Sequence, residues 1–198
     1  PHTLIDLTHY LAEFLTAVVD LIRQSLLQAP VLHADETPHR MLEGDETAKW
    51  FLWGFCDGKN SYFELHPTRS GTVASALLQE AQCHTLVSDV YAGYEKALTV
   101  VNATRPPETQ IQSAYCNAHS RRRFVEAQSA FPEEVQFYLD TYGEIYTLEA
   151  TCRQWGEAEL RAGDEERARD CRKKREALRK EMRPRFEAMQ SQGQDHLK

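Results

Sequence analysis

The sequence predicts a mixed α/β fold, in which flanking helices cover a mixed five-stranded sheet, with an amphipathic helix before it and an all-helical segment after it. Three observations lead to this fold class. Apolar residues recur at helical spacing near the start of the chain, strand-like runs then alternate with helical stretches, and no strand-like run follows residue 132. We therefore expect an N-terminal helix at 1–30, a sheet-containing core at 31–132 and a helical segment at 133–198.

The first helix is expected over residues 3–28. Six apolar side chains repeat at three- and four-residue steps and so share one face: Leu4, Leu7, Leu11, Phe14, Val18 and Leu21. Pro30 marks the end of the helix, since proline lacks the amide hydrogen that a helix interior needs. We expect this apolar face to pack in the core of the chain rather than to form a seam between copies.

Five runs with strand character follow the helix. They are expected at residues 31–35, 50–56, 61–66, 85–89 and 111–116, with a break at 35–38 and a turn at 57–60. Helices are expected at residues 71–82, 91–98 and 119–128. Three strands followed by alternating helices and strands match, by analogy of topology, a ribonuclease-H-like fold.

The last segment is expected to form two helices. Apolar positions such as Phe137, Tyr142 and Ile145 indicate the first, and the density of Glu, Arg, Lys and Ala over 157–187 indicates the second, which Pro184 should kink or interrupt. Opposite charges four residues apart are typical of an exposed, salt-bridged helix. A partner-binding helix is the alternative.

Composition narrows the class of protein. No apolar run of membrane-spanning length occurs in the sequence, so no membrane contact is expected. Five scattered cysteines favour reduced thiols in a cytoplasm over a disulfide framework. The formal net charge is −7; residues 1–100 hold 13 acids and 6 bases, whereas residues 101–198 hold 17 of each. Bound cations would offset this acidic excess in the first half.

Two aspartates stand at the ends of predicted strands. Asp35 closes the first strand and Asp89 the fourth, and these strands can be neighbours in a sheet of this order. Two carboxylates held close together repel unless a cation lies between them, and Mg²⁺ and Mn²⁺ prefer oxygen ligands. We therefore expect Asp35 and Asp89 to bind divalent metal and to support phosphoryl transfer. The alternative is that each is only a turn or helix-capping residue.

Short motifs in a fixed order resemble a known family. They are His33-Ala34-Asp35-Glu36-Thr37-Pro38, Trp53, Thr68-Arg69-Ser70-Gly71, Ser88-Asp89-Val90-Tyr91-Ala92-Gly93-Tyr94 and Cys116-Asn117-Ala118-His119-Ser120-Arg121-Arg122-Arg123-Phe124. Their order and spacing, over about residues 30–150, resemble the transposases of the insertion-sequence sixty-six family.

The resemblance implies a bacterial, cytoplasmic DNA transposase that cleaves and joins DNA strands with a pair of Mg²⁺ or Mn²⁺ ions held by an Asp-Asp-Glu triad. Asp35 and Asp89 match the first two acids. The third is expected in an Asn-Asn-x-x-Glu-Arg type helix that this sequence does not contain, so we expect the chain alone to be inactive or very weak in strand transfer. Glu126, Glu144 and Glu149 are local candidates, although a solvated helix face is the expected role of all three.

A basic tract opens the helix after the fifth strand. Arg121, Arg122 and Arg123, with nearby His119, are expected to contact the DNA backbone, because guanidinium groups bind phosphate well. A solvated face is an equal alternative. Cys116 and His119 have the spacing of half a zinc site, but no second pair stands out and zinc is not expected.

Three functions remain open at this stage. The first is a DNA transposase, with transposon ends and target DNA as partners and a homo-oligomer as a further option. The second is a nuclease or resolvase of the same fold, and the third is an inactive remnant that binds DNA or protein. No nucleotide cofactor is expected, because the sequence lacks the glycine-rich motif of a P-loop.

Overall fold

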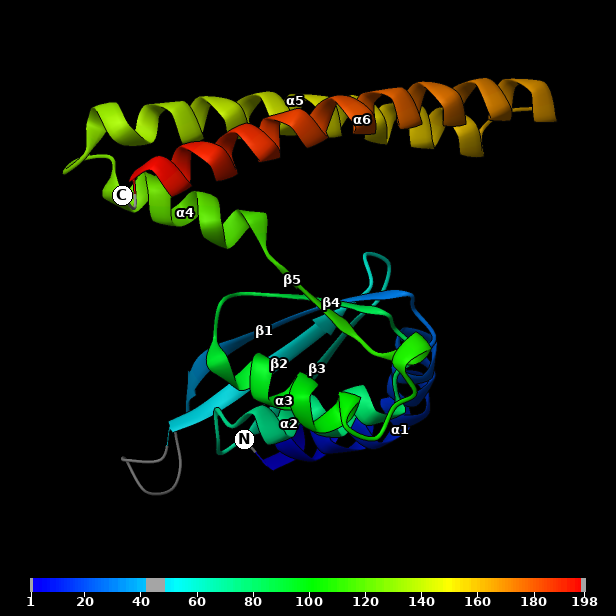
Figure 1. Ribbon diagram of the computed structural model, residues 1–198. Coiled ribbons are helices and arrows are strands. Elements are labelled where there is room, and N and C mark those ends of the chain that lie inside the picture. Colours follow the sequence, from blue (N-terminus) through cyan, green and yellow to red (C-terminus); the bar gives the residue numbers. More distant parts are fainter. Residues whose placement is uncertain (1, 42–48, 197–198) are drawn as a thin grey trace. The chain divides into compact units, whose positions relative to one another are not determined.

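The computed structural model describes residues 2–41 and 49–196 of the chain (Figure 1). The elements form two compact units, residues 1–116 and residues 117–198. No helix in the described ranges is both long and apolar enough to cross a membrane.

The first unit is built on a five-stranded mixed sheet. Its strands are β1 (Val31–Arg40), β2 (Lys49–Cys56), β3 (Ser61–His66), β4 (Thr85–Ser88) and β5 (Gln112–Tyr115). They lie in the order β3-β2-β1-β4-β5, with antiparallel pairs among β1, β2 and β3 and with β4 parallel to both β1 and β5. The predicted layout, with the first and fourth strands side by side, is confirmed.

β1 extends further than expected. The break predicted at residues 35–38 is wrong, because β1 continues to Arg40 and its Pro38 pairs with Phe51 of β2. The parallel partner β4 is in register with β1 only from Val31 to His33. Beyond that point β1 is paired on one side only in the described sheet, and proline is tolerated there because its missing N–H can face the open edge. Asp35 therefore lies within β1 rather than at its end.

The turn predicted at residues 57–60 is confirmed and joins β2 to β3. The Asp57 carboxylate accepts hydrogen bonds from the backbone amides of Asn60 at 2.7 Å and Lys59 at 2.8 Å. These bonds hold the pKa of Asp57 below its usual value. Gly58 has a φ of 86°, a backbone conformation that residues other than glycine rarely adopt.

Helices cover one face of the sheet. They are α1 (His2–Leu27), α2 (Gly71–Glu80) and α3 (Ala92–Asn102), followed by a short 3-10 turn, η1 (Pro107–Thr109) (Figure 1). Strand side chains on this face form the core with α2 and α3; Trp53 and Phe55 of β2 and Leu32 and Leu86 of the parallel pair are almost fully buried. The other two aromatic residues of β2, Trp50 and Phe51, are only partly buried.

α1 is the predicted helix, but the packing expected of it is wrong. Leu4, Leu7, Phe14 and Leu21 each expose more than half of their surface. Among the described residues, the helix contacts its neighbours only near its C-terminal end, where Arg23 pairs with Glu80 of α2 at 2.7 Å and the last leucines enter the core. The apolar face therefore extends beyond the layer that is available in this unit to cover it.

The second unit is all-helical and begins at residue 117, whereas the predicted helical segment begins at residue 133. It contains α4 (Asn117–Ala127), α5 (Pro132–Leu160) and α6 (Glu165–His196), and α5 and α6 pack as an antiparallel hairpin. A small core joins the two helices of the hairpin and consists of Tyr138, Tyr142, Ile145 and Met189. Phe124 of α4 stacks on Tyr138 with ring centres 4.3 Å apart. Contacts thus group α4 with this unit rather than with the sheet.

α6 continues through Pro184, so the interruption considered at this residue does not occur. The hydrogen bond lost at proline is offset by packing against α5 along the hairpin. Glu159 of α5 pairs with both Arg172 and Arg175 of α6 at 2.9 Å, which fixes the register of the two helices.

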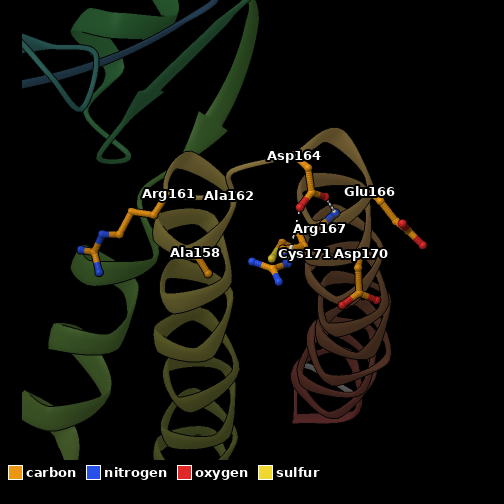
Figure 2. A pocket seen from close by; sticks show the side chains of 8 residues that line it. All are labelled: Ala158, Arg161, Ala162, Asp164, Glu166, Arg167, Asp170 and Cys171. Carbon is orange, nitrogen blue, oxygen red and sulfur yellow. Dashed lines mark hydrogen bonds and ion pairs between the residues drawn. The ribbon is translucent and has the colours of Figure 1, made fainter.

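A shallow hollow lies at the tip of the hairpin (Figure 2). Arg161, Asp164, Arg167 and Cys171 are among the residues around it. Asp164 accepts a 2.9 Å hydrogen bond from the Arg167 amide and lies 3.5 Å from its guanidinium group, so it acts as a cap at the start of α6. These groups serve the turn between the helices, and we assign no ligand to the hollow.

Candidate functional site

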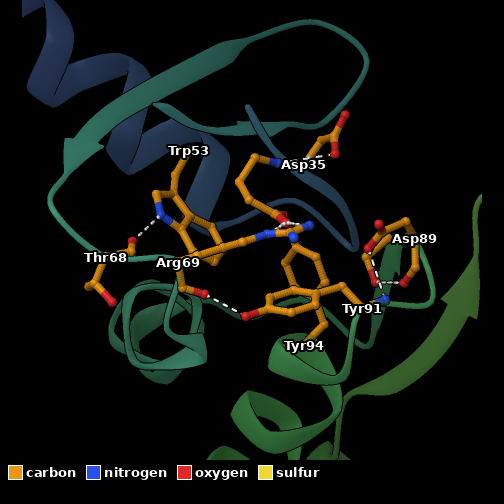
Figure 3. A network of polar contacts seen from close by, with 9 residues as sticks. Asp35, Trp53, Thr68, Arg69, Asp89, Tyr91 and Tyr94 are labelled. Atoms are coloured by element: carbon orange, nitrogen blue, oxygen red, sulfur yellow. Dashed lines mark hydrogen bonds and ion pairs between the residues drawn. The ribbon is translucent and has the colours of Figure 1, made fainter. Parts of the chain in front are cut away.

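The candidate site lies where the parallel pairing of β1 and β4 ends. The last partners in register are His33 and Val87. Asp35 and Asp89 each follow two residues later, so they stand at matching positions on neighbouring segments, and Figure 3 shows them at the same end of the sheet. The fold thus places the two aspartates that were expected to act as a pair on neighbouring segments at the same end of the sheet.

Each aspartate is oriented by the backbone that follows it. One oxygen of Asp35 accepts a hydrogen bond from the Glu36 amide, and one oxygen of Asp89 accepts a bond from the Tyr91 amide, both at 3.0 Å. Asp35 is exposed and Asp89 is half-buried. Both carboxylates are therefore held in place at a surface that a ligand can reach.

A buried carboxylate, Glu36, lies directly after Asp35. Along β1, Leu32, Ala34 and Glu36 face the helical layer, and the Glu36 side chain exposes only 1% of its surface. Arg69 reaches one carboxylate oxygen through Nε at 2.7 Å and Nη2 at 2.6 Å, while the Tyr94 hydroxyl donates to the other oxygen. A buried charge is stable only when it is paired and hydrogen-bonded, and Glu36 meets both conditions.

Arg69 connects the loop before α2 to the turn after β4. Its guanidinium carbon lies 4.2 Å from the centre of the Tyr91 ring, and its backbone oxygen accepts a 2.8 Å hydrogen bond from the Tyr91 hydroxyl (Figure 3). The hydrogen bond to Glu36 is the main cause that raises the pKa of Arg69, and attraction from Tyr91 and Asp89 adds to it.

Tyr94 of α3 closes the inner side of the site. Its ring is almost fully buried and stands edge-on to Trp53 and Tyr91, with ring centres 5.9 Å and 6.0 Å away. Burial is the main cause that raises the pKa of Tyr94, followed by Glu36, and the charges of Asp35 and Asp89 raise it further. The charges of both aspartates thus affect the same hydroxyl group.

The residues expected to bind DNA lie on α4, in the second unit. Arg121, Arg122 and Arg123 are exposed, and His119 is half-buried. Arg123 forms a 3.0 Å ion pair with Glu126, and the Arg121 guanidinium carbon lies 6.0 Å from the centre of the Tyr146 ring. The tract is thus presented on a helix that is packed against α5.

The glutamates considered as local third acids have contacts typical of a solvated helix face. Glu126 pairs with Arg123, Glu144 pairs with Arg185 at 2.8 Å, and Glu149 is exposed. Within residues 2–41 and 49–196, no group of three or more His, Cys, Asp and Glu side chains is arranged to hold a metal ion. All five cysteines are free thiols.

Reasoning from the sequence missed the roles of Glu36 and Arg69. A signal for Glu36 is present, because strand alternation puts it on the same face as Leu32 and Ala34, and a carboxylate on a buried face needs a cation. No signal identifies the cation, since Arg69 is 33 positions away and comes close only when the sheet and α2 have packed.

Comparisons with known proteins place the chain in a family. No curated protein matches the chain. A family model described as "Transposase IS66 family" matches residues 1–197. Because this match spans nearly the whole chain, the protein belongs to the IS66 family of transposases.

Proposed function

We propose that the chain provides two of the catalytic acids for metal-dependent phosphoryl transfer on DNA, in which strands are cleaved at transposon ends and joined to a target. In this proposal the sheet unit is a ribonuclease-H-like catalytic core, and Asp35 and Asp89 are the first two acids of an Asp-Asp-Glu triad. Membership in a transposase family supports DNA as the substrate. The observation that carries the catalytic assignment is the matching placement of Asp35 and Asp89 on neighbouring segments.

The donor set suits Mg²⁺ or Mn²⁺. Both side chains offer only oxygen atoms, which these cations prefer, and two neighbouring carboxylates repel each other without a cation. The amides of Glu36 and Tyr91 hold one oxygen of each aspartate, so the carboxylates are oriented before a cation binds.

Positioning is the main task of the protein in such a reaction. Divalent cations, when bound, activate a water molecule or a DNA 3′-hydroxyl and stabilise the leaving oxygen. The parallel strands hold Asp35 and Asp89, and the contacts among Glu36, Arg69 and Tyr94 brace the segments that carry them. We further propose that His119, Arg121, Arg122 and Arg123 contact DNA phosphates, a contact that added salt weakens.

Metal-dependent stability tests the assignment. A cation that binds only the folded state raises the free energy of unfolding by about 2.7 kcal/mol at a hundredfold excess over Kd. We expect Asp35→Asn and Asp89→Asn to lose this gain. In EDTA, both variants should be at least as stable as the wild type, because a like-charge repulsion is removed. Thermal unfolding in EDTA and in MnCl₂ measures both effects.

Glu108→Gln is the matched control. Glu108 is an exposed acid of η1 in the same unit, and its loss removes the same charge far from the proposed ligands in sequence. This variant should keep the full metal response. If Asp35→Asn and Asp89→Asn also keep it, the two aspartates do not bind the cation and the assignment fails. Metal-dependent nicking of a DNA substrate by the same variants, placed in a full-length enzyme that contains the third acid, then tests the reaction.

A further inference from the structure

We propose that Arg69 is a phosphate-binding residue of this site, which contacts a non-bridging oxygen of the DNA phosphate that is presented to Asp35 and Asp89. This inference rests on the proposed function and adds a residue to it. Three observations carry it: the donors that Arg69 leaves accessible, the way its side chain is held, and its place beside the aspartates.

The guanidinium group of Arg69 has more donors than its internal partner uses. It carries five N–H groups in a planar fork. Nε and Nη2 both approach a single oxygen of Glu36, at 2.7 Å and 2.6 Å, and no described residue accepts a hydrogen bond from Nη1. Because 46% of the side chain is exposed, a ligand can approach the side chain that carries these donors.

Arg69 is held firmly although it is half exposed. Buried Glu36 fixes one edge of the guanidinium plane, and the Tyr91 ring lies against its face at 4.2 Å. The Tyr91 hydroxyl also binds the Arg69 backbone oxygen. A guanidinium group fixed in this way loses little conformational freedom when it binds an anion, and its planar fork suits phosphate oxygens.

The position of this cation fits a phosphate held at the aspartates. Tyr91, on which Arg69 stacks, donates its backbone amide to Asp89, and the charge of Asp89 is close enough to act on Arg69. Figure 3 shows the guanidinium group beside the segments that carry both aspartates. A fixed positive charge there stabilises the negative charge of a phosphoryl group during transfer.

A simpler role has to be separated from this one, namely that Arg69 only neutralises Glu36. Removing one partner of a buried ion pair leaves an uncompensated charge, whereas replacing both partners by neutral side chains is often tolerated. The double variant Glu36→Gln/Arg69→Gln therefore distinguishes the two roles. If neutralisation is the whole role, the double variant regains DNA binding together with stability.

The experiment compares the wild type, Arg69→Gln, the double variant and Arg69→Lys. Thermal midpoints and affinities for a short, labelled DNA duplex of mixed sequence are measured in Mn²⁺ over a series of salt concentrations. We expect Arg69→Gln to lower the midpoint and the double variant to recover most of that loss. Both should bind the duplex about tenfold more weakly, and the slope of log Kd against log salt should fall by about 1, because one phosphate contact is lost.

Arg69→Lys keeps the test decisive if the double variant does not fold. Its single ammonium group can pair with Glu36 but cannot also present a planar fork to a phosphate. We therefore expect Arg69→Lys to be more stable than Arg69→Gln but to bind DNA as weakly as Arg69→Gln does. Wild-type affinity in Arg69→Lys or in the double variant overturns the proposal.

Arg105→Gln is the matched control for stability. Arg105 lies in the same unit, and its guanidinium group donates to the backbone oxygens of Leu78 at 2.6 Å and Ala81 at 2.5 Å. Its loss should lower the midpoint and leave DNA affinity unchanged. Failure of the proposed function has a different signature, which is a wild type whose metal response does not depend on Asp35 and Asp89.

Discussion

Glu36 is a charged residue whose burial is made possible by hydrogen bonds from two partners. Arg69 comes from the loop before α2 and Tyr94 from α3, so three separate segments meet at one carboxylate. Loss of any member leaves another with an unmet charge or hydrogen bond. The three side chains should therefore be energetically coupled, and their substitutions should not be additive.

Tyr94→Phe measures the hydroxyl contact to Glu36 at neutral pH. We expect the free energy of unfolding to fall by about 1.5–3 kcal/mol, the range for a hydrogen bond to a charged group. Urea denaturation followed by circular dichroism gives the value. Tyr10→Phe on the exposed part of α1 is the control and should change stability by less than about 0.5 kcal/mol.

The same substitution should change the response to alkaline pH. Burial and Glu36 raise the pKa of Tyr94 above its usual value of 10.0, so the unfolded chain releases this proton at a lower pH than the folded protein. The contribution of Tyr94 to stability is thus complete below about pH 10 and is lost as the pH rises beyond it. Urea denaturation across this range should show a steeper decline in the wild type than in Tyr94→Phe. Tyr62, whose pKa is raised to about 12, adds a decline in both proteins. Equal slopes would show that Tyr94 is not the cause.

At the scale of elements, α2 and α3 approach each other through glycines at their starts. A Cβ on Gly71 would overlap the backbone oxygen of Gly93, and a Cβ on Gly93 would overlap the Tyr91 ring. The absence of side chains at these positions lets the loop with Arg69 lie against the turn with Tyr91. The geometry of the site therefore depends on the packing of two helices as well as on the sheet.

Gly71→Ala and Gly143→Ala should have opposite effects on stability. The first forces α2 away from the backbone at Gly93, and we expect a loss of at least about 2 kcal/mol from overpacking. The second adds a methyl group to an exposed position of α5 with no neighbour within 4 Å, and we expect a gain of about 0.5–1 kcal/mol. Chemical denaturation of both variants shows whether each substitution raises or lowers the free energy of unfolding. An unchanged stability in Gly71→Ala would contradict the close approach of Gly71 to the backbone of Gly93.

At the scale of the whole molecule, the residues that the structure describes form two separate cores. One lies between the sheet and its helices, and the other joins the α5–α6 hairpin to α4. The proposed catalytic carboxylates belong to the first unit, and the proposed DNA-binding tract belongs to the second. Function in this proposal therefore requires both units, although each has a core of its own.

Separate cores predict separate effects of core substitutions. Leu86→Ala in the first unit and Ile145→Ala in the second should each cost about 2–5 kcal/mol, because each removes a buried side chain. Each substitution should lower the midpoint of the unfolding transition of the unit that contains the substituted residue. Fluorescence of Trp50 and Trp53 reports on the first unit when Trp155 is replaced by phenylalanine. Fluorescence of Trp155 reports on the second unit when Trp50 and Trp53 are replaced by phenylalanine. A single transition shifted equally by both substitutions would argue for one cooperative unit.

The predicted positions of strands and helices were close to the observed ones because each element has its own hydrophobic period. The errors came where tertiary contacts overrode a local signal. Turn-favouring residues at 35–38 are extended because β2 pairs with them, and the apolar stripe of α1 is exposed because the sheet and α2 meet only the end of that helix.

By itself the sequence determined the kinds of elements, their order, and the two aspartates that follow apolar strand residues, because these are local properties of the chain. Only the tertiary structure decided that β1 runs beyond Asp35, that much of α1 stays exposed, and that Glu36 joins Arg69 and Tyr94. The partners of Glu36 are 33 and 58 positions away. A local pattern can show that a buried charge needs a partner, but which distant residue reaches it depends on how the sheet and helices pack.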